Sequence, residues 1–120
     1  MSNILVSVVS ISKDNYQSLF KTLESVKALN YQKTEHIIID GDFNDGSKQL
    51  LKSYSHSKVY KFFSESDSGI SSAFNKGLNK STGDLIFFLN SGDLFSSDTV
   101  ISEVVESYLV QNGNLLLVLP

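Results

Sequence analysis

Residues 35–41 have the sequence EHIIIDG, in which three consecutive isoleucines are followed by an aspartate and a glycine. An uninterrupted apolar run rich in β-branched residues is typical of a strand that is covered on both faces. The abrupt change at Asp40-Gly41 predicts that the strand ends there. An acid at the end of a buried strand loses hydration, so Asp40 is expected to have a partner or a ligand.

The same strand pattern recurs on both sides of this stretch, and apolar residues at helical spacing fill the intervals between strands. Strands are predicted at residues 4–11, 35–40, 59–63, 84–89 and 115–119. Helices are predicted at residues 16–26, 47–54, 70–78 and 99–109. This alternation predicts an α/β fold with a mainly parallel sheet of about five strands and helices on both faces.

Length and composition limit the classes of protein that the chain can belong to. Its 120 residues suffice for one domain, and 41% are hydrophobic, as in ordinary globular proteins. The formal net charge of −3 argues against binding to nucleic acid. No cysteine is present, which excludes disulfides, thiol catalysis and cysteine-based zinc sites. The first residues lack the pattern of a secretory signal, so a cytoplasmic location is expected.

Acidic residues follow three of the predicted strands. They lie in the segments 40–47, 65–69 and 90–93. In parallel sheets, ligands bind beyond the carboxyl ends of the strands. Carboxylates that converge there suit a divalent cation or hydrogen bonds to sugar hydroxyls and base amides, and a nucleoside diphosphate needs both. Each cluster by itself also fits an ordinary turn, because Asp and Asn followed by Gly are common turn residues.

Other motifs of this kind are absent from the sequence. There is no phosphate-binding P-loop, no dinucleotide fingerprint and no Gly-x-Ser-x-Gly elbow. His36 and His56 have no third ligand at metal-binding spacing and are expected to be structural or solvated. The phenylalanine pairs at 62–63 and 87–88 are expected in the core, because no basic residues interleave with them.

Several motifs occur together in one order, and together they resemble the family 2 glycosyltransferases of the GT-A fold. They are LVSVV at 5–9, IIDG at 38–41 with NDGS at 44–47, SDSGI at 66–70, NKG at 75–77 and FLNSGD at 88–93. The resemblance covers residues 4–98 and is strongest to the bacterial branch that builds colanic acid and related exopolysaccharides. It implies an inverting transfer of a sugar from a UDP-, GDP- or dTDP-sugar to a hydroxyl of a saccharide or lipid-linked acceptor.

The resemblance also implies the roles of individual residues on the donor side. Asp40 would bind the nucleotide base, and Ser10 and Ser12 would help to hold the base or the ribose. Asp67 would lie near the ribose or the diphosphate. Asn75 and Lys76 would stand on the helix behind it.

A divalent metal, Mg²⁺ or Mn²⁺, is implied as the cofactor, with Asp93 as its ligand. The family motif is Asp-x-Asp-Asp, whereas this chain has Asn90 and Gly92 at the first and third positions. Asp93 is therefore the one carboxylate left for the cation, with help from the amide oxygen of Asn90. Many relatives also have Arg where this chain has Phe74.

The segment after Asp93 offers no general base. It contains Glu103 and Glu106, which fall on a predicted helix and are expected to be solvated surface acids. Residues 1–120 are therefore expected to be the nucleotide-sugar-binding portion of a domain that is truncated at its C-terminus. The resemblance to enzymes that use lipid-linked acceptors also allows association with the inner face of a membrane.

Two alternatives of other classes remain open at this point. Strand-end acids on a small α/β domain also describe a receiver-like signalling module, although the first strand lacks an acid pair and no lysine follows Leu119. An inactive homologue kept for partner contacts is the second alternative. In that case the apolar strand Leu115–Leu119 could serve as an edge for docking or oligomer formation.

Overall fold

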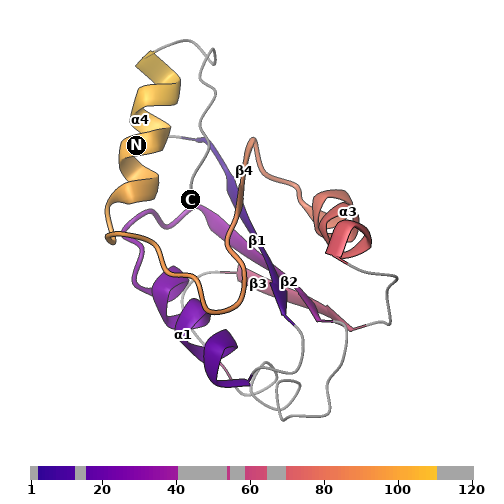
Figure 1. Cartoon of the computed structure of the whole chain (residues 1–120). Coiled ribbons are helices and arrows are strands. Elements are labelled where there is room, and N and C mark those ends of the chain that lie inside the picture. The colour runs from indigo at the N-terminus through magenta and orange to yellow at the C-terminus, as the bar shows by residue number, and fades with distance from the viewer. Residues whose placement is uncertain (1–2, 13–15, 41–53, 55–58, 65–69, 111–120) are drawn as a thin grey trace.

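The computed structural model describes residues 3–12, 16–40, 54, 59–64 and 70–110. Strands and helices alternate along the chain, except that β3 follows β2 in the order of the described elements (Figure 1). They are β1 (Val6–Ser12), α1 (Tyr16–Lys27), β2 (Thr34–Asp40), β3 (Val59–Ser64), α3 (Ile70–Lys80), β4 (Leu85–Phe88) and α4 (Val100–Val110). The helix predicted at 47–54 and the strand predicted at 115–119 lie outside the described residues, apart from Tyr54.

The described strands form one parallel sheet in the order β3-β2-β1-β4. The predicted α/β class and the parallel sheet are confirmed. Because all strands run the same way, their carboxyl ends lie along one edge of the sheet. The pairing of β1 with β2 places Ser12 beside Asp40, and that of β2 with β3 places Asp40 beside Ser64.

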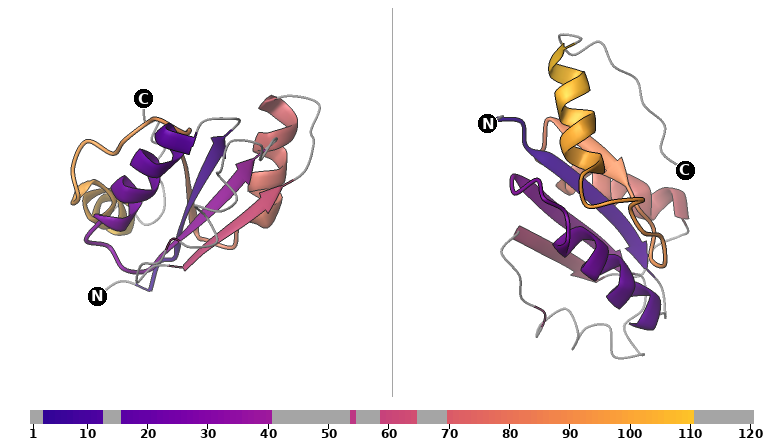
Figure 2. Two further views of the ribbon diagram at one scale, coloured as in Figure 1. Left: turned by 90° about the horizontal axis from the view of Figure 1, so that it is seen from below. Right: turned by 90° about the vertical axis from the view of Figure 1, so that its left-hand side faces the viewer.

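Helices cover both faces of this sheet, as Figure 2 shows. On one face, α1 and α4 pack over β1 and β4 through a cluster that includes Val8, Val26 and Ile101. On the other face, α3 packs through Ala73 against Val9 and neighbouring residues of β2. Both faces of the central strands are thus covered, which explains the unbroken apolar runs in their sequences.

The close approach of α3 to the sheet depends on Gly77. A Cβ atom at this position would lie 2.3 Å from Cγ1 of Val9, well inside van der Waals contact. Only a glycine lets the helix backbone rest directly on the side chain of Val9. The NKG motif therefore has a packing role at its third residue.

Two aromatic residues are more exposed than the sequence pattern predicts. Phe20 belongs to the helix predicted at residues 16–26, but 41% of it is exposed, and its ring packs edge-on against Tyr54. Phe88 was expected in the core, but 43% of it is exposed, although its neighbour Phe87 is buried. Because successive residues of a strand point to opposite faces, β4 turns Phe88 toward Phe74 of α3 at the edge of the sheet. The core prediction was wrong for Phe88.

Among the described helices, none is long and apolar enough to cross a membrane.

Candidate functional site

The carboxyl edge of the sheet brings together segments that are far apart in the sequence. Beyond the end of β4, the amide of Leu89 donates to the carbonyl of Val9 at 2.8 Å. The amide of Ser91 then donates to the carbonyl of Ile11 at 3.0 Å. The Asn90-Ser91 segment therefore continues alongside the end of β1, and β1 in turn pairs with the end of β2 at Asp40.

Three buried polar atoms gather along this edge. They are Oγ of Ser12, Oδ1 of Asn90 and Oγ of Ser91, and none has a hydrogen-bond partner in the structure as described. Most buried polar groups in folded proteins are hydrogen-bonded, because an unpaired one costs desolvation free energy. The hydrogen bonds that these three atoms need must therefore come from ordered water or from a polar ligand.

Asp93 follows these atoms at the end of a tight turn. The amide of Asp93 donates to the carbonyl of Asn90 at 2.9 Å, which closes the turn over residues 90–93. Gly92 occupies its third position with φ of +97°, where any other residue is strained. The turn leaves the Asp93 side chain exposed at the edge of the sheet.

The structure adds Thr22 to the predicted site residues. Thr22 is a fully buried residue of α1, and its hydroxyl accepts a hydrogen bond from the amide of Gly92 at 2.8 Å. The same hydroxyl donates to the carbonyl of Asp93 at 3.1 Å. The only sequence signal for this contact is a threonine between Leu19 and Val26 on the buried face of an amphipathic helix.

Ser10 lies deeper than the other predicted donor-binding residues. Its hydroxyl is fully buried and hydrogen-bonds Nε2 of His36 at 2.8 Å. His36 is itself fully buried in β2, so its expected structural role agrees with this position. The Ser10 hydroxyl therefore links β1 to His36 of β2. Ser10 lies two residues before Ser12 on β1, on the same face of the sheet.

The other predicted residues are placed less completely. Asp67 lies outside the described residues, and for Asp40 the description covers the backbone. Asn75 is exposed and Lys76 is half-buried, and both belong to α3, on the face of the sheet opposite α1 (Figure 2). The edge therefore brings together Ser12, Asp40, Asn90 and Asp93, while Asn75 and Lys76 belong to a different layer.

The oxygen atoms at this edge fit a hard divalent cation. Oδ1 of Asn90 is buried without a partner in the described structure, and the Asp93 carboxylate lies three residues further along the same turn. Amide and carboxylate oxygens are the ligands that Mg²⁺ and Mn²⁺ prefer. Within the described ranges, no three His, Cys, Asp or Glu side chains converge, so substrate oxygens would have to complete the coordination.

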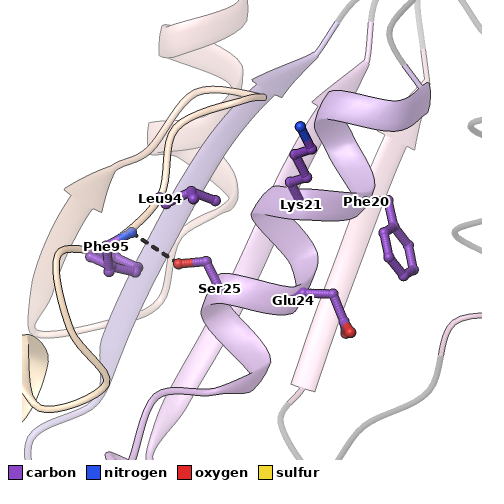
Figure 3. Close-up of a pocket in the computed structure, with 6 residues that line it drawn as sticks. All are labelled: Phe20, Lys21, Glu24, Ser25, Leu94 and Phe95. Atoms are coloured by element: carbon purple, nitrogen blue, oxygen red, sulfur yellow. Dashed lines mark hydrogen bonds between the residues drawn. The ribbon is translucent and has the colours of Figure 1, made fainter.

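A shallow groove of about 350 Å³ lies next to the turn and crosses α1 (Figure 3). Figure 3 shows Phe20 and Glu24 on the side of α1 away from Leu94 and Phe95. The Ser25 hydroxyl accepts a hydrogen bond from the amide of Phe95 at 2.9 Å within it. The groove is open and mainly apolar, so it does not resemble a site for a charged diphosphate.

The opposite, amino-terminal edge of the sheet holds the buried acid Glu35. Its carboxylate accepts hydrogen bonds from the Ser7 hydroxyl at 2.6 Å and from the amide and hydroxyl of Thr82 at 2.7 and 2.9 Å. Lys61 Nζ lies 3.7 Å from it. Burial by itself raises the pKa of Glu35, but these hydrogen bonds and the lysine charge outweigh it and lower the pKa below its ordinary value of 4.5.

Comparison with known sequences gives the relatives of the chain. It is 38% identical over 103 residues to an uncharacterized glycosyltransferase of Mycobacterium tuberculosis, covering 85% of this chain and 39% of that protein. It is 30% identical over 96 residues to TuaG of Bacillus subtilis, which is named for teichuronic acid biosynthesis, covering 78% of this chain and 38% of TuaG. The chain thus spans about two fifths of the length of these relatives.

Solved structures share the fold of the chain. The mannosyltransferase PcManGT from Pyrobaculum calidifontis, in complex with GDP-Man and Mn²⁺, aligns with a TM-score of 0.80 at 17% identity. The alignment covers 89% of this chain and 33% of PcManGT. TarS of S. aureus, in complex with UDP-GlcNAc, aligns with a TM-score of 0.82 at 15% identity and covers 91% and 32%.

The family match excludes one of the classes that the sequence left open, the receiver-like module. Residues 7–115 match the family described as Glycosyl transferase family 2, which covers every described strand and helix except the first residue of β1. Because the matched family is not a receiver family, the receiver-like alternative is excluded. The chain belongs to glycosyl transferase family 2.

Proposed function

We propose that this chain is the donor-binding part of an inverting, metal-dependent glycosyltransferase that moves a sugar from a nucleotide diphosphate to an acceptor hydroxyl. The observation that carries the proposal is the cluster of buried oxygen atoms without partners at Ser12, Asn90 and Ser91, beside the exposed Asp93 carboxylate. Oxygen donors in this arrangement suit a ligand that combines a cation with hydroxyl and amide groups.

The nucleoside would bind where β1 and β2 end. Ser12 supplies a buried hydroxyl there, and the backbone register brings Asp40 next to it. We assign to Asp40 the hydrogen bond to the base and to Ser12 a hydrogen bond to the base or ribose. Ser10 would act through His36, with which its hydroxyl is paired. Asp67 is proposed to lie near the ribose or the diphosphate.

The diphosphate would bind over the turn at residues 90–93. Asn90 and Asp93 are proposed to hold Mg²⁺ or Mn²⁺, and Asn75 and Lys76 to line the path of the phosphates from the side of α3. When bound, the cation would offset negative charge on the departing diphosphate. The chain itself would orient the donor by the Ser12, Asp40 and Asn90 contacts, which fix the sugar relative to the acceptor.

Substrate class is proposed from the relatives. PcManGT and TarS are described with GDP-Man and UDP-GlcNAc, and TuaG is named for the synthesis of a polysaccharide. We propose a uridine, guanosine or thymidine diphosphate sugar as donor and a saccharide or lipid-linked acceptor in exopolysaccharide synthesis, at the cytoplasmic face of a membrane.

Calorimetry tests the proposal with UDP, GDP and dTDP, each titrated into the full chain with Mn²⁺ and with EDTA. At least one nucleotide should bind, and Mn²⁺ should tighten its binding. Asp93→Ala should abolish the Mn²⁺-dependent gain. Asp98→Ala, a change at an exposed aspartate outside the turn, should leave it intact. Absence of binding by all three nucleotides, or an unaltered Mn²⁺ response in Asp93→Ala, contradicts the proposal.

A further inference from the structure

We propose that Thr22 is a positioning residue that sets the cation affinity of the turn at residues 90–93 without touching the cation. The inference rests on the proposed function, because it takes Asp93 as the cation ligand. It goes beyond that function by assigning control of the ligand's geometry to a helix on one face of the sheet.

The Thr22 hydroxyl both accepts a hydrogen bond from backbone groups of the turn and donates one to them. It accepts from the Gly92 amide at 2.8 Å and donates to the Asp93 carbonyl at 3.1 Å. Its oxygen also lies 3.4 Å from the Asn90 carbonyl. One buried hydroxyl on α1 therefore binds backbone groups of the turn on both sides of the Gly92–Asp93 peptide bond.

This bonding pattern is unusual for a threonine in the middle of a helix. Such a hydroxyl commonly bonds back to the carbonyl four residues earlier in its own helix. Here it bonds to a segment about 70 residues away in the sequence instead. The contact ties the turn to a rigid helix, and Gly92 makes the turn possible by adopting φ of +97°.

A second hydroxyl extends the same attachment by one helical turn. Ser25 of α1 accepts from the amide of Phe95 at 2.9 Å (Figure 3). Asp93 therefore lies between two points at which its segment is fixed to α1. With both points in place, the backbone at Asp93 is fixed relative to α1, and the cation does not have to order the segment when it binds.

The test measures Mn²⁺ binding in the presence of UDP or GDP, whichever binds the wild-type chain, by the electron paramagnetic resonance signal of free Mn²⁺. Thr22→Val keeps the shape of the side chain and removes the hydroxyl. It should weaken Mn²⁺ binding about 10-fold or more, as loss of an outer-shell partner does in other metal sites. Thr22→Ser restores the hydroxyl and should recover the affinity to within about 2-fold.

Thr34→Val is the matched control. Thr34 is also buried, and its hydroxyl donates to the carbonyl of Tyr31 at 2.8 Å, at the opposite edge of the sheet. It should lower the unfolding midpoint and leave Mn²⁺ affinity unchanged. Nucleotide affinity in EDTA should be the same for all three variants.

The outcomes separate the inference from the function on which it rests. A wild-type chain that binds no Mn²⁺ overturns both. A wild-type chain that binds Mn²⁺, with a folded Thr22→Val variant of equal affinity, overturns the inference alone. If Thr22→Val does not fold, Gly92→Ala tests whether cation affinity depends on the shape of the turn that Thr22 holds, because a methyl group at positive φ strains that turn. Unchanged Mn²⁺ affinity in that variant also overturns the inference.

Discussion

The two edges of the sheet differ in whether their buried polar side chains have hydrogen-bond partners. At the amino-terminal edge, the carboxylate of Glu35 accepts hydrogen bonds from Ser7 and Thr82 and lies near Lys61. At the carboxyl edge, the buried side-chain oxygens of Ser12 and Asn90 have no partner in the structure as described. Both edges belong to the same strands, so composition alone does not explain the difference.

The contrast shows how a structural acid can be told from a ligand-binding group. A buried carboxylate whose hydrogen bonds are complete contributes to the folded state and offers little to a ligand. Buried oxygens without protein partners reduce stability unless an ordered water or a ligand supplies the missing bonds. The amino-terminal edge therefore holds a hydrogen-bonded acid, whereas the carboxyl edge holds buried oxygens that have no partner in the described structure.

Removing the Glu35 carboxylate should have the largest effect on stability. Glu35→Ala leaves the Ser7 hydroxyl and the Thr82 amide without their acceptor, so the free energy of unfolding should fall by about 2–4 kcal/mol. Glu35→Gln keeps the shape and part of the bonding and should cost less. Urea unfolding followed by circular dichroism measures both. A loss below about 0.5 kcal/mol in Glu35→Ala would show that the cluster does not stabilise the fold.

A pair of serines on β1 compares the two edges directly. Ser7 is 0% exposed and Ser12 is 2% exposed, so their removal from water is equivalent. Ser7→Ala removes a donor to Glu35 and an acceptor of the Gly83 amide, and should cost about 1–3 kcal/mol of stability. Ser12→Ala removes no hydrogen bond found in the described structure and should change stability by less than about 0.5 kcal/mol.

For nucleotide affinity, Ser12→Ala should have the larger effect and Ser7→Ala the smaller one, the reverse of their effects on stability. Ser12→Ala should weaken nucleotide affinity about 5-fold, the equivalent of one lost hydrogen bond, and Ser7→Ala should leave it unchanged. Calorimetry on the folded variants measures both affinities. Equal losses of affinity in the two variants would remove the distinction between the edges.

The stability supplied by Glu35 should depend on pH, with a smaller effect than loss of the carboxylate. Its pKa in the folded chain lies below the ordinary value of 4.5, so its contribution is fully present above that value. The contribution is lost as the pH falls from there through the folded pKa. Urea unfolding of wild type and Glu35→Gln between about pH 7 and pH 3 measures the difference, which should shrink on acidification. A difference that does not change with pH contradicts the assignment.

Lys61 should have the smallest effect. Its side chain is 46% exposed and its Nζ lies 3.7 Å from the Glu35 carboxylate, so water screens much of the attraction. Lys61→Met should lower the free energy of unfolding by less than about 1 kcal/mol, and less than Ser7→Ala does. Added salt should reduce the difference from wild type. A larger loss than that of Ser7→Ala would mean that the ion pair, and not the hydrogen bonds, holds Glu35.

The elements of the fold were predictable because their signals are local. Isoleucine runs such as 37–39 are unbroken since both faces of the strand are covered, and this pattern is visible without a structure. Phe88 was wrongly predicted to be in the core, and Phe20 is exposed on a helix that was predicted correctly, for a different reason. Hydrophobicity predicts burial only where another element covers the residue, and no described element fully covers either side chain.

The candidate site was predictable in part. The acids after the strands are found from the sequence, and parallel topology implies that they share an edge. The contact between Thr22 and Gly92 is not predictable in this way, nor is the pairing of Ser10 with His36. A threonine in a helix and a serine in a strand have no sequence pattern that indicates their partners.

The amino-acid sequence by itself determined the order of strands and helices and the placement of acidic and amide residues after the strands, because these depend on periodicity within short windows. Only the tertiary structure decided which buried polar groups are satisfied. The partners of Glu35 lie 28 and 47 residues away, and those of Thr22 about 70 residues away. Hydrogen bonds are short and directional, so their pairing is settled only when helices and strands pack against each other.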